Sequence, residues 1–288
     1  MRKYIILGFL CISGLFVFSV VEYLNFYDGK LGITICDVGQ GDGVVIKSPQ
    51  GYVMLFDAGP DDAILSCLSS VMPFWQRDLD LVMISHPHAD HFMGMFSIFP
   101  SYTIKTYASE TLVNRSSSFK ELQKKLAELG LKQRNFAKGD KIILPDGVRI
   151  TVLGPSDEFL ERASPTGDIS DVKELVSLVV LIEYGNFSAL LTGDSEVSGL
   201  EDAEVPDVVF LQVPHHGSAS GLSEKILDRI NPEIATISVG ENKYGHPTTK
   251  ILDLLQQDRV PTYRTDIAGN ITLKTDGKKH FLKREKPD

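Results

Sequence analysis

Two kinds of hydrophobic pattern divide the chain. Residues 4–21 form one uncharged apolar run, whereas from residue 31 onward short apolar segments alternate with Gly, Asp and Pro. The early body predicts strands in meander pairs, over residues 31–38, 44–47, 52–56, 79–85, 141–144, 148–153, 175–183 and 187–191. Later strands alternate with helices, the strands over 208–213, 234–239 and 271–274 and the helices over 222–230 and 248–257. Two earlier helices are expected over 63–71 and 118–129, a tight turn over 39–43 and a polar loop over 155–173. This order favours two mixed sheets packed face to face, with helices outside.

The N-terminal run has the features of a membrane segment. Arg2 and Lys3 precede it and Glu22 follows it. As a helix it would be about 27 Å long, which barely spans a bilayer core of about 30 Å. The positive-inside rule then places the body outside the cytoplasm. We interpret residues 1–24 as a single-pass anchor on the extracytoplasmic face or, alternatively, as a cleaved signal peptide of a secreted protein.

The composition of the whole chain is that of a globular protein. Hydrophobic residues make up 43% and charged residues 23%, which allows a sizeable core and excludes disorder and a multi-span membrane protein. With 29 Lys and Arg against 38 Asp and Glu, the net charge is −9. That balance argues against non-specific nucleic-acid binding by surface charge, although local capture of a polyanion at a metal centre stays open. Cys36 and Cys67 are interpreted as two buried thiols, with one bridge between them as the extracytoplasmic alternative.

Histidine is concentrated in three short tracts. The first follows directly on the buried strand over 79–85 and contains three imidazoles and one carboxylate, from His86, His88, Asp90 and His91. Neutral imidazole and carboxylate are good ligands for zinc and similar divalent ions. We expect His86 and His88 to point to one side of the turn and Asp90 and His91 to the other, so that two metal ions share the loop. The alternative is a solvated His-rich turn.

Further candidate ligands follow later strands. Asp194 comes after the strand over 187–191, where a carboxylate could bridge two cations. His215 and His216 follow the strand over 208–213, and Gly217 permits close backbone approach. His246 lies in a loop after the strand over 234–239. The plainer interpretations are a turn carboxylate for Asp194 and hydrogen-bonded structural residues for the histidines.

Other polar residues are expected to support this chemistry. Lys243, Tyr244 and His246 could grip an anionic substrate or protonate a leaving group. Asp57 could orient a metal-bound His, and the Gly-rich turn from Asp37 to Asp42 could cradle an oxyanion on backbone N–H groups. That turn is not a dinucleotide-binding fingerprint, because neither the glycine spacing nor a following helix fits. For Asp37, Asp42 and Asp57 the alternative is an ordinary turn residue.

These motifs together resemble a known superfamily. His86-Pro87-His88-Ala89-Asp90-His91, preceded by Asp57-Ala58-Gly59 and followed by Thr192-Gly193-Asp194, looks like the metallo-β-lactamase superfamily. The segments 37–42, 191–194, 214–218, 238–240, 242–247 and 264–266 are more narrowly similar to the C-terminal hydrolase domain of ComEC-type competence (DNA-uptake) proteins. The resemblance covers about residues 31–276. It implies an α/β (α+β) fold, the four-layer αββα sandwich, for a hydrolase domain over 31–288, with metals at one edge of the two sheets.

The resemblance also assigns roles to individual residues. It implies His86 and His88 on one ion, Asp90 and His91 on the other, and Asp194 between the two. His215, or alternatively His216, would complete the second site. The ions would be Zn²⁺, or alternatively Mn²⁺. Beyond what the resemblance implies, we expect proton transfer by Asp90, Asp194 or His246, substrate contacts from Asp42, Ser218, Lys243 and Tyr244, and support of the ligands from Asp37, Asp57 and Ser177.

Two departures from the family pattern shape the functional hypothesis. No His lies between His91 and Asp194, where the superfamily has another ligand, and the segment 174–179 retains Ser177 but lacks the Asn residues of close relatives. The first metal site is therefore expected to be weak or open. The multi-span channel part of ComEC proteins has no counterpart here, so DNA transport by this chain alone is not expected.

The expected function is that of an extracytoplasmic metal-dependent phosphodiesterase or nuclease. Its substrate would be a phosphodiester, either single-stranded DNA or a component of the cell envelope, and the N-terminal segment would attach it to the membrane. One alternative is a lactonase or β-lactamase-like hydrolase. Another is a catalytically silent envelope protein that binds a partner.

Overall fold

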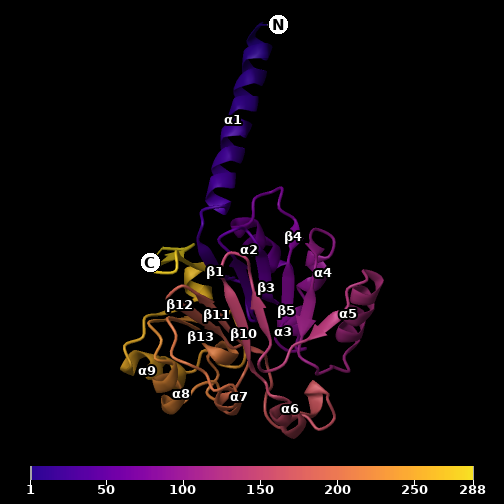
Figure 1. The fold of residues 1–288 in the computed structure, drawn as a ribbon, viewed down its shortest axis with the longest axis vertical. Helices are drawn as coiled ribbons and strands as arrows, with labels where there is room; N and C mark the ends of the chain where they lie inside the picture. The colour runs from indigo at the N-terminus through magenta and orange to yellow at the C-terminus, as the bar shows by residue number, and fades with distance from the viewer. Residues whose placement is uncertain (1, 288) are drawn as a thin grey trace.

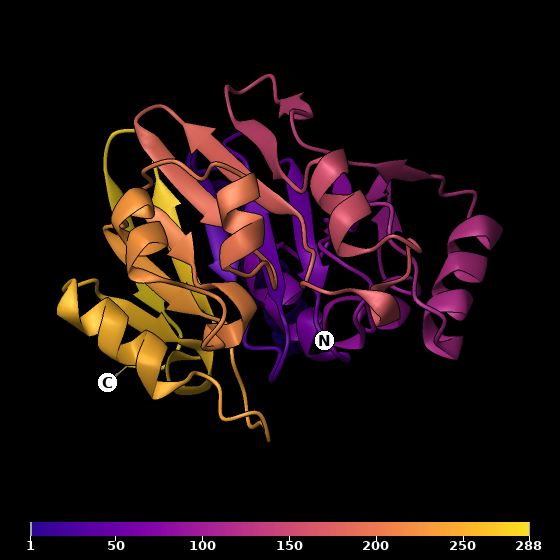
Figure 2. The same ribbon diagram turned by 90° about the horizontal axis from the view of Figure 1, so that it is seen from below.

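The protein is a sandwich of two β-sheets, as the computed structural model of residues 2–287 shows; the side chains of residues 2, 3 and 5–8 are not described. Within these residues an eight-stranded and a seven-stranded sheet pack face to face, and helices cover the outer faces (Figures 1 and 2). A two-stranded ribbon, β4 (Asp78–Leu79) with β6 (Thr103–Ile104), lies beside them. The αββα architecture expected from the sequence is confirmed.

The first sheet combines a meander with parallel strands. Its order is β17-β16-β1-β2-β3-β5-β7-β8. The bounds are β1 (Leu31–Ile35), β2 (Gly43–Lys47), β3 (Val53–Ala58), β5 (Leu81–Ile84), β7 (Tyr107–Ser109), β8 (Gln133–Asn135), β16 (Ile271–Thr275) and β17 (His280–Arg284). Strands β3, β5, β7 and β8 run parallel, so their carboxyl ends meet at one edge. The outer face carries α2 (Ala63–Val71), α3 (Ala89–Phe92), α4 (Met95–Ile98) and α5 (Ser117–Glu128).

The second sheet is built in the same way. Its order is β15-β14-β13-β12-β11-β10-β9. The bounds are β9 (Lys141–Ile143), β10 (Arg149–Gly154), β11 (Val179–Tyr184), β12 (Phe187–Leu191), β13 (Phe210–Gln212), β14 (Ile234–Ile237) and β15 (Thr262–Arg264). Strands β12 to β15 run parallel. Its outer face packs on α7 (Val197–Asp202), α8 (Glu224–Ile230) and α9 (Thr249–Gln257).

The strand sequences explain the layers. In β1 all five residues are buried, because this strand is covered on both faces. Ile33 and Ile35 pack toward the second sheet, whereas Val45 and Val53 of neighbouring strands join the layer under the helices. The two sheets therefore share a continuous apolar centre, and the polar positions of the chain are pushed to the ends of the strands.

Two ends of the sandwich follow from this arrangement. We call "site end" the edge where β5, β12 and β13 finish. We call "anchor end" the opposite edge, where α1 (Arg2–Phe26) runs into β1 and where β2 finishes next to the start of β1. Figure 1 shows α1 as a long helix that projects from the body at this end.

Helix α1 is long and apolar enough to cross a membrane. Its window Phe9–Phe26 has a mean hydropathy of 1.8, and one such helix occurs among the described residues. The helix ends two residues beyond the segment 1–24 expected from the sequence. The side chains of Arg2 and Lys3, on which the expected orientation rests, lie outside the described part of the chain.

Several sequence-based expectations need correction. The segment 155–173 is not a plain loop but contains α6 (Asp157–Ala163) and a 3₁₀ turn over Ile169–Asp171. Ser156 caps α6 by accepting a hydrogen bond from Phe159 N. The strand over 271–274 is not the last one, because β17 follows it. Strands expected over 31–38 and 234–239 end at Ile35 and Ile237, and the helix expected from 222 begins at Glu224.

The cysteines also differ from the favoured interpretation. Cys36 and Cys67 are not two thiols but one disulfide, with their Cα atoms 5.6 Å apart. The bond ties α2 to the segment that follows β1. Because that segment leads into the Gly-rich turn at residues 39–43, the disulfide braces one wall of the site end.

Candidate metal centre

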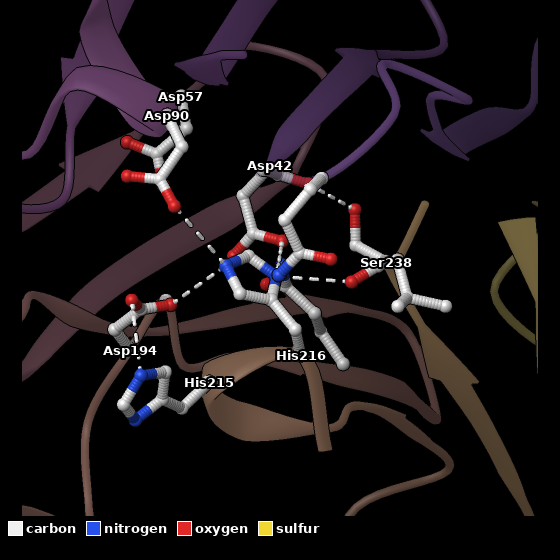
Figure 3. A network of polar contacts seen from close by, with 12 residues as sticks. Asp42, Asp57, Asp90, Asp194, His215, His216 and Ser238 are labelled. Atoms are coloured by element: carbon white, nitrogen blue, oxygen red, sulfur yellow. Dashed lines mark hydrogen bonds and ion pairs between the residues drawn. The ribbon is translucent and has the colours of Figure 1, made fainter. Parts of the chain in front are cut away.

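The site end gathers polar side chains from strands that are distant in sequence. Strand β5 ends just before His86, β12 just before the turn that carries Asp194, and β13 just before the turn that carries His215 and His216. The loop between β1 and β2 brings Asp42 to the same place. In Figure 3 the side chains of Asp42, Asp90 and Asp194 point toward His216, which lies in the middle of the network.

The first histidine tract and Asp194 form the deepest part of the cluster. His91 Nε2 lies 3.3 Å from Asp194 Oδ1, and His86 Nε2 lies 3.7 Å from Asp194 Oδ2. Both imidazoles are fully buried. Ligand atoms of these three residues lie within 4.8 Å of one another, a spacing that one cation could bridge. His86 and His91 therefore converge on the same carboxylate, although the sequence suggested opposite sides of the turn.

His216 completes a second group of ligand atoms. Its Nε2 lies 3.4 Å from Asp194 Oδ1 and 3.7 Å from Asp90 Oδ2. Asp90, His91 and His216 also place one ligand atom each within 4.8 Å of the others. Both His215 and His216 have positive φ angles, of 52° and 53°. This rare left-handed backbone lets two adjacent imidazoles reach the same cluster.

The nitrogen opposite the cluster is held on each buried imidazole. His91 Nδ1 donates to Asp57 Oδ2 at 2.9 Å, and His216 Nδ1 donates to Ser238 O at 2.9 Å. His86 Nδ1 contacts Ser85 Oγ at 3.1 Å. These contacts fix the ring orientations and leave each Nε2 facing the centre. A hydrogen bond on the far nitrogen is the usual support of a metal-bound His.

Burial and charge act on the ionisation of the cluster. Burial opposes the charged form of His91, yet the carboxylates of Asp194 and Asp57 outweigh it and hold the His91 pKa well above its usual range. The pKa of Asp194 is held well below its usual range, because His91 and His216 outweigh the effect of burial. Burial, together with His91, lowers the pKa of His86 well below its usual value. The carboxylates therefore favour positive charge at the centre of the cluster.

The donor atoms fit a divalent cation. His86 Nε2, His91 Nε2, His216 Nε2 and Asp194 Oδ1 are buried and have no hydrogen-bond partner within residues 2–287. Buried polar atoms are nearly always paired, so several unpaired ones facing a common point require a ligand. Imidazole nitrogen with carboxylate oxygen is the donor set of zinc and similar transition metals.

A pocket of about 350 Å³ leads to this cluster. His88, His215 and His246 line it together with Asp194. His215 Nε2 lies 3.8 Å from Asp194 Oδ2, and its ring centroid is 5.5 Å from that of His246. His215 and His216 thus approach Asp194 from two sides. The sequence alone left open which of the two belongs to the cluster.

The mouth of the pocket carries the residues expected to meet substrate. Lys243 and Tyr244 line an adjoining hollow of about 720 Å³ together with Asp90. Tyr244 is 63% exposed, and Lys243 Nζ lies 5.7 Å from the centre of its ring. Gln40 lines both hollows and was missed by the sequence analysis, although it lies inside the Gly-rich turn that the analysis singled out.

Some predicted residues lie behind the site. Asp42 is buried with Oδ1 3.4 Å from His216 Nδ1, so it backs a ligand. Ser177 Oγ accepts a hydrogen bond from Asp194 N at 3.2 Å. Ser218 pairs with Ser220 at 3.1 Å. Asp37 forms an ion pair with Lys286 at 3.1 Å and is not part of the cluster.

Glu196 and Asn242 are two further residues that the sequence analysis missed. Glu196 Oε1 lies 3.7 Å from His215 Nδ1. Asn242 Oδ1 accepts hydrogen bonds from Tyr244 N and His246 N, and its amide donates to His246 O. Asn242 thereby shapes the loop that carries the mouth residues. A turn-forming Asn beside three functional candidates was the available signal.

The fold and the buried His/Asp cluster together define the class of protein. A family description, "Metallo-beta-lactamase superfamily", matches residues 36–241, and the chain belongs to this superfamily of metal-dependent hydrolases. Within this superfamily the chain is related to competence proteins. It is 27% identical to ComE operon protein 3 of Bacillus subtilis, over 94% of this chain and 36% of the relative. Recombination protein 2 of Haemophilus influenzae is 25% identical, over 90% and 31%. The chain thus spans about a third of the length of these relatives.

Solved structures agree with the fold. The metallo-beta-lactamase fold protein YhfI from Bacillus subtilis aligns with a TM-score of 0.55 and 13% identity, over 85% of this chain and all of that one. CmlA, a diiron beta-hydroxylase from Streptomyces venezuelae, aligns with a TM-score of 0.55 and 16% identity, over 85% of this chain and 54% of that one. At such low identity these likenesses establish the sandwich alone.

Proposed function

We propose that this chain is a two-metal phosphodiesterase attached to the extracytoplasmic face of a membrane. Residues 1–24 would serve as the anchor and residues 31–288 as the hydrolase domain. The observation that carries the proposal is the convergence of buried, unpaired imidazole and carboxylate atoms at the site end. Hydrogen-bond donors and acceptors are kept unpaired in a protein interior where a ligand satisfies them.

The geometry supports a particular division of the ligands. His86, His88 and His215 would surround the first cation, and Asp90, His91 and His216 the second, with Asp194 between them. His215 thereby takes the place of the His that is absent between His91 and Asp194. Two contacts support this division: His215 Nε2 is 3.8 Å from Asp194 Oδ2, and His88 lines the same pocket.

Bound divalent cations would activate water as a nucleophile and offset charge on a phosphoryl oxygen. The protein's own residues then position the reaction. Asp57, Ser85 and Ser238 keep the rings of His91, His86 and His216 oriented. His246 Nδ1 is buried and lacks a hydrogen-bond partner among the described residues. Burial and neighbouring His215 lower the His246 pKa, so this imidazole is neutral at pH 7 and would pass a proton on to a leaving group rather than retain it.

Single-stranded DNA is the phosphodiester that the mouth suits best. The names of the relatives refer to competence and recombination. Tyr244 offers an exposed ring on which a base could stack, and Lys243 supplies a cation beside it. The net charge of −9 disfavours long duplex DNA, whereas divalent cations would reverse the sign locally. A cell-envelope phosphodiester is the other substrate of the same chemistry.

Two features support the extracytoplasmic location. The disulfide between Cys36 and Cys67 is of the kind that persists in oxidising compartments. Helix α1 is apolar and projects from the body, with a window of which 6% is buried.

Hydrolysis of bis-p-nitrophenyl phosphate tests the proposal. The full chain should cleave it with added Zn²⁺ or Mn²⁺, and EDTA should abolish cleavage. Asp194→Asn should lower kcat/KM by at least about 10³-fold, because several kcal/mol of transition-state stabilisation depend on the cations that it joins. Asp253→Asn, an equivalent change at an exposed position of α9, should have no effect.

Other outcomes point to the alternatives. Cleavage of a chromogenic β-lactam without cleavage of the phosphodiester would favour a β-lactamase-like hydrolase. A chain that binds no metal and cleaves neither compound would be a silent binding protein. Wild-type turnover in the Asp194→Asn variant would refute the two-metal assignment.

A further inference from the structure

The junction between α1 and the body is rigid. Phe26, the last residue of α1, is 3% exposed and packs into the core layer under the helices. Lys47 Nζ donates to Phe26 O at 2.8 Å and to Asp28 Oδ1 at 2.6 Å, and Lys274 Nζ donates to Asp28 Oδ2 at 2.8 Å. Gly51 lies against the ring of Phe26 so closely that a Cβ there would come within 3.0 Å of it. Helix α1 therefore fixes the orientation of the body and is not a loose tether.

A cationic pocket opens beside this junction. It has a volume of about 430 Å³ and is lined by residues of α1, β1, β2, β16 and β17 and by the end of α2 with the segment that follows it. Its charged residues are four lysines and two acids: Lys30, Lys47, Lys274, Lys283, Glu22 and Asp28. Lys47 is 4% exposed and is occupied by Asp28, whereas Lys283 is exposed. The excess of positive charge is local, since the chain as a whole is negative.

Exposed aromatic rings lie next to the pocket. Phe74 is 61% and Trp75 38% exposed, and they follow directly on Pro73, which lines the pocket. Their rings contact each other edge to face with centroids 4.8 Å apart. In Figure 1 the loop between α2 and β4, which carries them, rises beside the base of α1. More than half of the Phe74 surface is therefore open to solvent.

We propose that the anchor end docks on the bilayer surface, with the Phe74–Trp75 loop inserted at the interface and the lysine pocket facing the headgroups of anionic lipids. The proposal rests on the membrane anchoring proposed above, and it is independent of the chemistry at the site end. The occupant of this surface is the membrane itself, because the rigid junction leaves the pocket within a few residues of the end of the spanning window.

The chemistry of the surface matches that of a membrane interface. Trp and other aromatic rings are enriched at the headgroup level, where one side of the ring is apolar and the other wet. Lysines near an anionic leaflet contribute about fivefold each to surface binding. Rings and cations beside a spanning helix can therefore act together, with Lys30 next to the junction and Lys283 farther along the same face of the sheet.

Trp75 makes the proposal directly measurable, since it is the only tryptophan of the chain. The full chain is reconstituted into vesicles of phosphatidylcholine and phosphatidylglycerol, with brominated acyl chains as the quencher in the bilayer and iodide as the quencher in water. We expect a blue-shifted emission, strong quenching by the brominated lipid and protection from iodide. Flotation of the same vesicles reports separately whether the chain is anchored.

Variants separate the rings from the charges. Phe74→Ser should reduce quenching by brominated lipid in every vesicle. Lys30→Glu combined with Lys283→Glu should remove the extra quenching that phosphatidylglycerol gives over pure phosphatidylcholine. Lys124→Glu combined with Lys132→Glu makes the same charge change at exposed positions away from the pocket and should leave quenching unchanged.

Each result decides the matter. Floating vesicles in which Trp75 is quenched by iodide and not by brominated lipid would overturn docking and leave the anchor intact. Equal losses in both lysine pairs would overturn the role of the pocket. A chain that does not float would overturn anchoring and docking together, whereas loss of phosphodiester cleavage with normal quenching would bear only on the proposed function.

Discussion

The two ends of the sandwich both bury charged and polar side chains, but they differ in whether these side chains have partners. At the anchor end, buried charge is compensated: Lys47 and Lys274 share the carboxylate of Asp28 within 2.8 Å. At the site end, buried polar atoms of His86, His91 and Asp194 are left without hydrogen bonds inside the described chain. Burying a polar group without a partner costs free energy, so the unpaired atoms at the site end lower the stability of the fold unless a ligand satisfies them.

This difference indicates which end of the protein needs a bound ligand to satisfy its buried polar atoms. The buried charges of the anchor end are compensated by its own side chains. The site end is completed by ligands, because its polar atoms face a common centre and their far nitrogens are held by the protein. Substitutions at the two ends should therefore affect different quantities, which the following predictions test.

The largest effect is expected on metal affinity. His216→Gln should weaken binding of the second cation by at least about 100-fold, because it removes a ligand whose supporting contacts alone are worth 10- to 100-fold. Competition with a chromogenic chelator measures this. His280→Gln, at the anchor end, should bind metal like the parent. Unchanged affinity in the His216 variant would place the second cation elsewhere.

The largest effect on the free energy of unfolding is expected from pH. Glu110, after β7 at the site end, is fully buried, and burial raises its pKa from 4.5 to about 8. The folded state therefore holds a proton that the unfolded state releases above pH 4.5. Stability from this group is fully present below that pH and is lost as pH rises toward about 8, by about 1.4 kcal/mol per pH unit.

Glu110→Gln keeps the neutral form and should abolish this loss. Urea unfolding at pH 5 and pH 8 measures it, and the variant should be more stable than the parent at the higher pH. Glu128→Gln, at an exposed position of α5, is the matched control. A parent whose stability does not fall over this range would show that Glu110 ionises freely.

The smallest effect is expected at the anchor end. Lys47→Met should lower the free energy of unfolding by about 2 kcal/mol, because charged hydrogen bonds to Asp28 and to Phe26 O are lost. Lys47 lies a full strand length from the metal ligands, so kcat should stay at the parent value. Urea unfolding and phosphodiester hydrolysis on the same sample test both parts. A fall in kcat would mean that the two ends are coupled.

Much of the fold could be predicted, because the strong signals are those of burial. The apolar segment predicted as one strand over 79–85 contains β5 (Leu81–Ile84), with Leu79 in the short β4, and the helix expected over 118–129 is α5 at 117–128. Two of the missed strands are exposed: β8 has three exposed residues, and β17 alternates between exposed and half-buried ones. The missed strand β7 is buried but only three residues long. Their pairing comes from the neighbouring strand and not from their own pattern. Helix α6 was missed because it is only seven residues long and lies in a polar segment without a clear helical periodicity.

The candidate site was predictable in membership and not in geometry. Strand ends followed by His or Asp indicated which residues would meet. Which faces they present depends on the positive φ at His215 and His216 and on partners such as Asp57 and Ser238. Those are properties of the folded backbone. The pairing of Cys36 with Cys67 likewise depends on the packing of α2 against the end of β1.

The placement of α1 opposite the His/Asp cluster affects the direction from which a substrate can reach the pocket. Strands of five or six residues separate the two, a standoff of roughly 17–20 Å. Under the proposed arrangement, with α1 in a bilayer and the body on the extracytoplasmic face, the mouth of the pocket would face away from the membrane. A molecule embedded in the lipid would then lie that distance from the pocket. A nucleic-acid strand that approaches from the side away from the membrane would reach the pocket directly.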